Sequence, residues 1–343
     1  MKGNISIIGN FGFLENKING QTVKTRNLLD LLNIKSQKNI TYFDTSSTKS
    51  NKLTLISLLK TLFTASKIIY MPAHSNLKFL FPILYLICKI RNVDIVYVVI
   101  GGWLPEFIKT KWFHKWALKN IKVIFCETNQ MKSKLENWYN YKNVKLLPNF
   151  RLNNNNPIFL DNGNQLKIVF MSRIIIEKGL DVIFRFLDNN NNLESPANIE
   201  VTFYGPIANE SLDYFNSQIA KFDNAKYLGI LEPSEINNTL NSYDVLVLPT
   251  RYPGEGFPGA ILDAYISGIP VVVSNWKDIA EFVEKEKTGF VFELNQEENF
   301  GKSIYKIYNN KDLLKEMKLN SFEKSKEYSS ESCWNKLSPY LTN

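Results

Sequence analysis

The alternation of short β-rich runs with helical patterns constrains the fold most, and it occurs twice along the chain. Runs of three to seven mostly β-branched or aromatic residues are separated by longer segments with helically spaced apolar residues. Such alternation predicts a parallel sheet covered by helices on both faces. A polar, turn-rich stretch at 149–165 separates the two series and contains an asparagine run at 153–156. A chain of 343 residues also exceeds what one core accommodates. The sequence therefore predicts two doubly wound α/β domains.

The expected elements follow from this pattern. In the first series the expected strands are 5–8, 40–43, 67–71, 94–100, 123–126 and 144–147, and the expected helices are 23–32, 53–63, 77–90, 105–119 and 131–139. In the second series the expected strands are 167–171, 200–204, 225–228, 245–248, 271–273 and 289–292. The expected helices there are 180–187, 212–222, 234–241, 260–267, 279–284 and most of 297–325.

The predicted domain boundaries follow the same break. They place an N-terminal domain at 1–150, a linker at 151–165 and a C-terminal domain at 166–325. A helical tail at 326–343 is expected to pack back on the N-terminal domain. Ligands of open α/β sheets bind outside the carboxyl ends of the strands, so the default site is the cleft between two such domains.

Composition excludes several classes of protein. The three cysteines are widely spaced and the chain has two histidines, which fits neither a disulfide framework nor a histidine-rich metal site. We expect a reduced, cytoplasmic setting. The first residues lack the pattern of a signal peptide. The most apolar stretch, Leu77–Ile90, is shorter than the roughly 20 residues that span a bilayer.

Charge is distributed unevenly between the two halves. Residues 1–150 hold 22 Lys and Arg against 7 Asp and Glu, and residues 151–343 hold 19 against 26. A basic first half suits nucleic acid, an anionic membrane or a phosphorylated substrate, or is simply a solvated surface. No nucleic-acid recognition motif is present, so no nucleic-acid partner is expected.

A Gly/Pro-rich loop joins a buried strand to a helix in the second half. The strand Tyr243–Thr250 runs into Arg251–Gly259, and the next helix follows at once. A helix start presents backbone N–H groups and a positive dipole to an anion. Glu255 lies in the loop and Asp263 lies eight residues later in the helix, so the two carboxylates can bind different hydroxyls of one ligand.

This segment resembles the signature of family 4 glycosyltransferases, a retaining family with the GT-B fold of two Rossmann-like domains. The matching residues are Glu255–Pro258, Asp263–Tyr265 and Ser267–Val272. The resemblance implies that Glu255 contacts the donor sugar and that the second carboxylate contacts the ribose. Here the second carboxylate is Asp263, where the family has Glu, so it reaches one methylene less. The resemblance also implies donor contacts by the loop residues Gly256, Phe257, Pro258 and Gly259.

Two cations follow the first strand of the second half. Arg173 and Lys178 lie between the strand that ends at Met171 and the helix that begins at Leu180. Fixed cations suit a diphosphate leaving group, because its negative charge grows as the glycosidic bond breaks. In family 4 members the same Arg…Glu-Lys-Gly pattern holds the donor diphosphate, so the resemblance assigns Arg173, Lys178 and Glu255 to catalysis.

Candidate residues also occur in the first half. A glycine-rich loop ends at Gly20, just before a helix, and is expected to approach the donor phosphate and the acceptor. Many family members have a histidine after the strand 94–100, but this chain has Gly102 and Trp103 there. His74 is the nearest histidine. These three residues predict an acceptor pocket of different shape, although a structural role for His74 remains an alternative.

The segment Trp103–Lys119 interleaves aromatic residues with four lysines. This composition suits a membrane interface, and a core-facing aromatic stripe with solvated lysines is the alternative. With the basic first half, it favours peripheral attachment to the inner face of an anionic membrane.

Together with these features, the resemblance implies a retaining transferase that moves a hexose-type sugar from a UDP- or GDP-sugar to a glycan or a lipid-diphosphate-linked acceptor. The resemblance points to synthesis of bacterial capsule, O-antigen or exopolysaccharide. No cofactor or metal is expected, because Arg173, Lys178, the backbone at Gly20 and helix N-termini supply positive charge. A sugar-nucleotide epimerase and a non-catalytic sugar-nucleotide-binding module are the alternatives.

Overall fold

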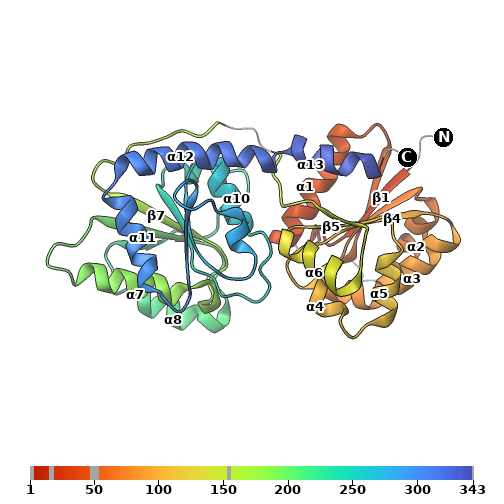
Figure 1. Cartoon of the computed structure of the whole chain (residues 1–343), viewed down its shortest axis with the longest axis horizontal. Helices are drawn as coiled ribbons and strands as arrows, with labels where there is room; N and C mark the ends of the chain where they lie inside the picture. The colour runs from red at the N-terminus through yellow and green to blue at the C-terminus, as the bar shows by residue number, and fades with distance from the viewer. Residues whose placement is uncertain (1–3, 15–18, 47–53, 153–155, 342–343) are drawn as a thin grey trace. The chain divides into compact units, whose positions relative to one another are not determined.

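The chain forms two compact units in a computed structural model that describes residues 4–14, 19–46, 54–152 and 156–341 (Figure 1). The first unit takes the described part of 1–153 together with 328–341. The second unit takes the described part of 154–327.

The first unit contains a parallel sheet of six strands within the described residues, in the order β2-β1-β3-β4-β5-β6. The strands are β1 (Asn4–Gly9), β2 (Asn39–Asp44), β3 (Lys67–Met71), β4 (Asp94–Val98), β5 (Val123–Cys126) and β6 (Val144–Leu146). The helices are α1 (Gly20–Lys35), α2 (Thr54–Thr64), α3 (His74–Ile90), α4 (Leu104–Ile108), α5 (Trp112–Lys119), α6 (Asn129–Tyr139) and α13 (Ser330–Leu337).

Alternate strand residues divide the core of this unit between the two faces of the sheet. Ile68 and Tyr70 of β3 pack with α2 to α6, whereas Ile69 and Met71 of the same strand pack with α1 and α13. Successive side chains of a strand point to opposite faces, so both faces must be apolar. Figure 1 shows α1 and α13 on one side of these strands and α4 to α6 on the other.

The C-terminal segment 328–341 contacts two lysines of the N-terminal part of the first unit. Lys35 of α1 forms an ion pair with Glu331 at 2.6 Å, and the Lys67 ammonium donates to the carbonyl oxygen of Tyr340 at 2.7 Å. Cys333 of α13 lies in the core on that face of the sheet.

The second unit contains a second parallel sheet of six strands within the described residues, in the order β12-β11-β10-β7-β8-β9. The strands are β7 (Leu166–Met171), β8 (Ile199–Tyr204), β9 (Ala225–Tyr227), β10 (Val245–Leu248), β11 (Val271–Ser274) and β12 (Gly289–Phe292). The helices are α7 (Leu180–Asn191), α8 (Leu212–Ile219), α9 (Ile236–Leu240), α10 (Gly259–Ile266), α11 (Glu298–Tyr308) and α12 (Lys311–Ser325). Figure 1 shows α7 and α8 on one side of the strands and α10 and α12 on the other. Both sheets are doubly wound, so the predicted fold class of two Rossmann-like units is confirmed.

Three expected helices differ from those of the structure. The expected helix 105–119 is two helices, α4 and α5, whose buried apolar positions stay in phase, so periodicity cannot detect the break. The expected helix 279–284 is a short 3₁₀ turn, Ile279–Phe282. The expected helix 297–325 is interrupted at Asn310, whose side chain accepts from the backbone N–H of Leu313 and caps α12.

Candidate functional site

The predicted donor residues lie where the strand order of the second sheet reverses. The chain proceeds from β7 to β9 in one direction along the sheet, and β10 then pairs with the other side of β7. The loops that leave β7 and β10 therefore meet at the carboxyl edge of the sheet. A crevice at such a switch point is the usual ligand site of an open α/β sheet.

Glycine at 179 permits the close contact between these two loops. Gly179 has a φ of 88°, and a Cβ at this position would lie 2.1 Å from the carbonyl oxygen of Pro249. The backbone N–H of Arg251 donates to the carbonyl oxygen of Glu177 at 2.7 Å, and the Thr250 hydroxyl lies 3.3 Å from the same oxygen. A side chain at 179 would separate the loops, so this position requires glycine.

The contact brings Lys178 and Glu255 together as a buried ion pair. Lys178 is 8% exposed and Glu255 is 7% exposed, and the ammonium donates directly to the carboxylate. The Thr250 hydroxyl lies 3.2 Å from the same carboxylate oxygen and donates to it or to Glu177. The sequence predicted a role for each residue of the pair, but not that they would contact each other from positions 77 residues apart.

Tyr252 lies beneath both predicted cations. The Arg173 guanidinium carbon is 5.1 Å from the centre of its ring, and the Lys178 ammonium is 5.0 Å from it. Arg173 is exposed, whereas Lys178 is buried, so Arg173 presents its charge to solvent. Tyr252 and Thr250 were missed by sequence reasoning. The sequence offered one signal for Tyr252, namely that it is an aromatic residue in the loop that follows β10.

The rest of the loop leads into α10. Phe257 is 4% exposed, and its ring stacks on Phe282 with centroids 3.7 Å apart, so its side chain packs inside the unit. Only the backbone of residue 257 is therefore in a position to contact a donor. Gly256 and Pro258 are buried beside it, and Gly259 begins α10. Asp263 lies in α10 and is 5% exposed.

The predicted acceptor residues of the first unit lie together at the carboxyl edge of its sheet. His74 begins α3 after β3, and its ring centroid lies 5.1 Å from that of Trp103 and 4.5 Å from that of Phe107. The Trp103 indole N–H donates to the carbonyl oxygen of Ile100 at 2.9 Å, across the turn that contains Gly102. The structure thus brings together residues from two neighbouring strand ends.

Gly20 lies in the first turn of α1 and is exposed. Asn19 caps this helix by accepting from the backbone N–H groups of Gln21 and Thr22 at 3.0 Å. No atom lies within 4 Å of a Cβ built at Gly20, so the space in front of this turn is open. Residues 15–18 of the predicted glycine-rich loop lie outside the described residues.

A second buried ion pair was missed by sequence reasoning. Lys24 of α1 is 1% exposed, and its ammonium lies 2.6 Å from the carboxylate of Glu127, which follows β5 and is 3% exposed. The other carboxylate oxygen of Glu127 accepts from the backbone N–H of Gly101 at 3.3 Å. The pair therefore fixes the turn that precedes Trp103. A charged residue directly after a buried strand was the available signal.

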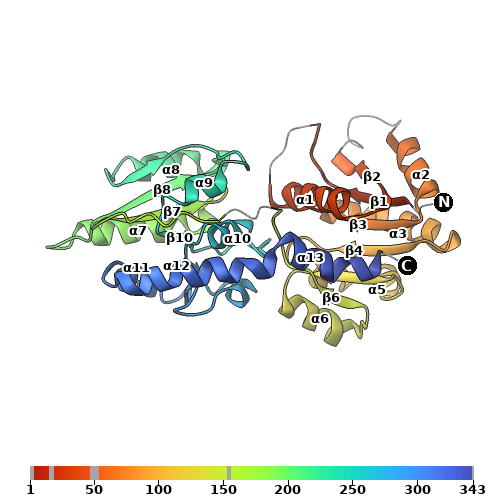
Figure 2. The same ribbon diagram turned by 90° about the horizontal axis from the view of Figure 1, so that it is seen from above.

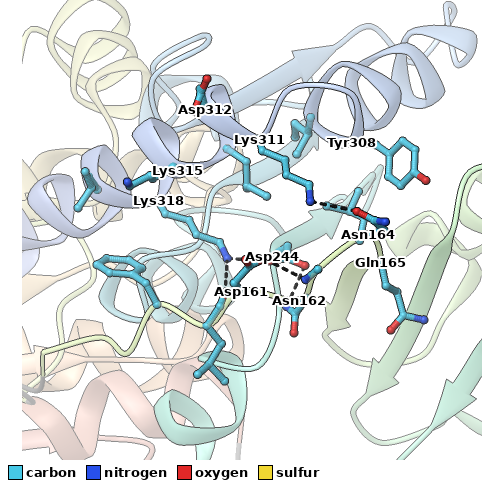
Figure 3. Close-up of a pocket in the computed structure, with 17 residues that line it drawn as sticks. Asp161, Asn162, Asn164, Gln165, Asp244, Tyr308, Lys311, Asp312, Lys315 and Lys318 are labelled. Atoms are coloured by element: carbon cyan, nitrogen blue, oxygen red, sulfur yellow. Dashed lines mark hydrogen bonds and ion pairs between the residues drawn. The ribbon is translucent and has the colours of Figure 1, made fainter.

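A cavity of about 530 Å³ lies at the opposite edge of the second sheet (Figure 3). Its lining includes Asp244, which precedes β10, so it faces the amino ends of the strands. Asp244 accepts from the Lys318 ammonium at 2.7 Å, from the Asn162 amide at 3.0 Å and from the backbone N–H of Lys167 at 3.0 Å. Figure 3 shows Lys318 and Asn162 directed at this carboxylate. Three donors within the unit thus satisfy the hydrogen-bonding capacity of this carboxylate. We interpret the contacts as structural, since the one with Lys318 holds α12 in place.

Among the residues that the structure describes, no cluster of three or more His, Cys, Asp or Glu is arranged to hold a metal ion. Within the same residues, no helix is long and apolar enough to cross a membrane.

Comparison with known protein families gives a match in the second half of the chain. The family described as glycosyl transferases group 1 matches residues 153–324, which is half of the chain. This segment contains all the residues of the site at the carboxyl edge of the second sheet.

The names of two curated relatives identify those proteins as glycosyltransferases. An uncharacterized glycosyltransferase of Methanocaldococcus jannaschii, MJ1178, is 23% identical over 233 residues, which cover 67% of this chain and 62% of the relative. The UDP-Gal:alpha-D-GlcNAc-diphosphoundecaprenol alpha-1,3-galactosyltransferase of Escherichia coli is 38% identical over 80 residues, which cover 23% of this chain and 20% of that protein. The matches thus span less than two thirds of the length of either relative.

A solved structure resembles the chain over nearly its whole length. Alr3699/HepE of Anabaena, solved in complex with UDP-glucose, has a TM-score of 0.76 and 13% identity, with 99% of each chain covered. The similarity at this identity concerns the fold, and it confirms the GT-B architecture that the motifs predicted.

Proposed function

Because the chain belongs to the glycosyl transferases group 1 family, we propose that it is a retaining hexosyltransferase that uses a UDP- or GDP-sugar as donor. The observation that carries the proposal is the convergence of Arg173, Lys178 and Glu255 around Tyr252 at the carboxyl edge of the second sheet. Two cations and one carboxylate at a strand-order switch suit a sugar diphosphate, since the cations can bind its phosphates and the carboxylate can bind sugar hydroxyls.

The proposed donor contacts divide between charge and hydroxyl groups. Arg173 and Lys178 bind the diphosphate, Glu255 binds the sugar, and Asp263 binds the ribose. Backbone N–H groups between Gly256 and Gly259 lie near the start of α10, where the helix dipole favours an anion. The Anabaena structure contains UDP-glucose, and a donor of the same class in this chain is part of the proposal.

The proposed reaction depends on stabilising the leaving group. The bond between the anomeric carbon and the diphosphate oxygen breaks, and the negative charge that develops on the diphosphate faces Arg173 and Lys178. The acceptor hydroxyl attacks from the same face of the sugar, and the departing phosphate oxygen takes its proton. This route uses no metal, because fixed cations already neutralise the leaving group.

Glu255 constrains how Lys178 meets the donor. The Lys178 ammonium is paired with Glu255, and an ammonium has three donors. It can therefore retain the carboxylate and still donate to a phosphate oxygen. The pair would then position both the cation for the diphosphate and the carboxylate for the sugar.

For the acceptor, we propose a glycan carried on a lipid diphosphate, with His74, Gly102 and Trp103 near the acceptor end. The acceptor in the name of the Escherichia coli relative is such a lipid diphosphate. The aromatic contact of His74 with Trp103 offers a platform for a sugar ring. Capsule, O-antigen or exopolysaccharide synthesis is the setting we propose, with the protein peripheral to the inner face of the cytoplasmic membrane.

Turnover with a panel of UDP- and GDP-sugars tests the proposal, using the wild type and the variants Arg173→Ala and Lys178→Ala. Each variant should lower kcat/KM by about two orders of magnitude or more, because each removes a charge that stabilises the leaving group. Lys226→Ala, which removes an exposed cation that pairs with Glu200, is the control and should retain wild-type turnover. Near wild-type kcat/KM in both site variants would refute the assignment, and epimerised donor as the product would favour an epimerase.

A further inference from the structure

Helix α3 carries large apolar side chains on the face that points away from the core. Phe79, Ile83, Leu86 and Ile90 are 68%, 57%, 48% and 86% exposed. They are separated by four, three and four residues, which places them in one stripe along the helix. The opposite face of α3 is also apolar and is buried against the sheet. A surface helix of a monomer ordinarily has a polar outer face, so this stripe needs a partner.

The two neighbouring helices extend the stripe into one surface. Helix α3 packs against both α2 and α5, and Figures 1 and 2 show the three side by side in the first unit. We name the apolar residues exposed on these helices the outer face: Ile56, Leu59 and Phe63 of α2, the four residues of α3, and Trp112 and Trp116 of α5.

Contacts between the helices make the outer face continuous. The ring centroids of Trp116 and Tyr85 of α3 are 5.3 Å apart, and the Lys89 ammonium is 4.6 Å from the centre of the Trp116 ring. On the other side, the Arg91 guanidinium carbon lies 5.7 Å from the centre of the Phe63 ring. The apolar residues of the three helices therefore lie in one patch. Lys89 lies where α3 meets α5, and Arg91 lies where α3 meets α2.

The charge around the outer face is almost entirely positive. Residues 45–126 contain 12 Lys and Arg and only two acidic residues, Asp94 and Glu106. Both acidic residues are already paired with lysines. The described residues place no carboxylate within ion-pair distance of Lys78 or Lys89, which flank the stripe on α3, so their charge is available to an anionic partner.

We propose that the outer face of α2, α3 and α5 inserts into the head-group region of an anionic lipid bilayer. Apolar side chains flanked by lysines match both layers of such an interface. The apolar side chains enter the boundary between head groups and acyl chains, and the lysines bind lipid phosphates. Aromatic residues such as Trp112, which is 76% exposed, favour the same depth. This inference rests on the proposed lipid-linked acceptor for its purpose, and it differs from the sequence prediction by making α3 the main contact.

Vesicle sedimentation with phosphatidylglycerol-containing and pure phosphatidylcholine vesicles tests the inference. The variant Phe79→Ser/Ile83→Ser/Ile90→Ser should bind anionic vesicles at least about tenfold more weakly than the wild type, because it removes three of the four exposed apolar side chains of α3, the main contact. The control Leu193→Ser/Leu228→Ser/Ile230→Ser, which changes exposed apolar residues of the second unit, should bind within about twofold of the wild type. Equal binding by the wild type and the outer-face variant would overturn the inference, as would equal binding of the wild type to both vesicle types.

Site-specific labelling gives a second, independent measurement. Burial raises the pKa of Cys88, Cys126 and Cys333 to about 12 each, so these thiols stay protonated and resist labelling. A fluorophore on Ile83→Cys should shift to the blue when anionic vesicles are added, and the same fluorophore on Ile230→Cys should not. A probe at 83 that remains in water while the protein sediments with vesicles would overturn the inference.

Calorimetric titration with UDP and GDP separates this inference from the proposed function. The outer-face variant should bind nucleotide as the wild type does, since its substitutions lie in the first unit and leave the donor residues intact. Vesicle binding without any nucleotide binding by the wild type would refute the proposed function alone. Nucleotide binding without vesicle binding would refute the membrane inference alone.

Discussion

Replacing Glu255 with glutamine removes the charge that neutralises Lys178 while preserving the size of the side chain. Both residues are more than nine-tenths buried, so the remaining ammonium has little water to solvate it. Removing one partner of a fully buried ion pair costs about 3–5 kcal/mol. Lys178 keeps its contact with the ring of Tyr252, and the glutamine oxygen can still accept a hydrogen bond. We therefore expect Glu255→Gln to lower the free energy of unfolding of the second unit by about 2–3 kcal/mol.

Differential scanning calorimetry measures this loss, because it resolves separate transitions when the units unfold independently. A loss of 2–3 kcal/mol corresponds to a Tm lower by about 4–12 °C for a unit of this size. Glu323→Gln is the control, since Glu323 pairs with Lys326 on the surface of α12, where both side chains are more than half exposed. An exposed pair of this kind contributes about 0–1 kcal/mol, so the control should shift Tm by no more than a few degrees.

A double variant tests whether the loss arises from the pair itself. Lys178→Met leaves the Glu255 carboxylate buried without its cation and should also lower Tm. The double variant Lys178→Met/Glu255→Gln removes both charges and should lie above the Tm expected from adding the two single losses. Strict additivity, or single variants within about 0.5 kcal/mol of the wild type, would refute the buried pair.

Two further predictions concern the donor. Asp263→Asn should weaken the binding of UDP or GDP, because the proposed partner of this buried carboxylate is the ribose; equal affinity of the variant and the wild type in calorimetric titration would remove Asp263 from the site. Sugar transfer should continue in excess chelator, because Arg173 and Lys178 supply the charge that a divalent ion would otherwise provide. Loss of transfer with chelator, restored by Mg²⁺ or Mn²⁺, would show that a metal carries part of that charge.

Strand positions were predictable because the strands of a buried parallel sheet are continuous apolar runs. The bounds predicted for β3, β5, β10 and β12 are those of the structure. Helix ends were less predictable, since a break such as the one between α4 and α5 leaves the apolar positions in phase.

The chemical types of the candidate residues were also evident in the sequence. Arg173, Lys178, Glu255 and Asp263 each belong to a local motif beside a strand end or a helix start. Motifs of this kind are local because the turn or helix start that presents a side chain is built from adjacent residues.

By itself, the sequence determined two doubly wound α/β units and the residues that follow their strands, because these depend on local periodicity and local motifs. Only the tertiary structure decided which of those residues touch. The pairing of β7 with β10 joins Lys178 to Glu255, and Gly179 permits the contact. Which face of α3 is exposed was likewise undecided, since α3 is apolar on both faces and only packing against the sheet selects the buried one.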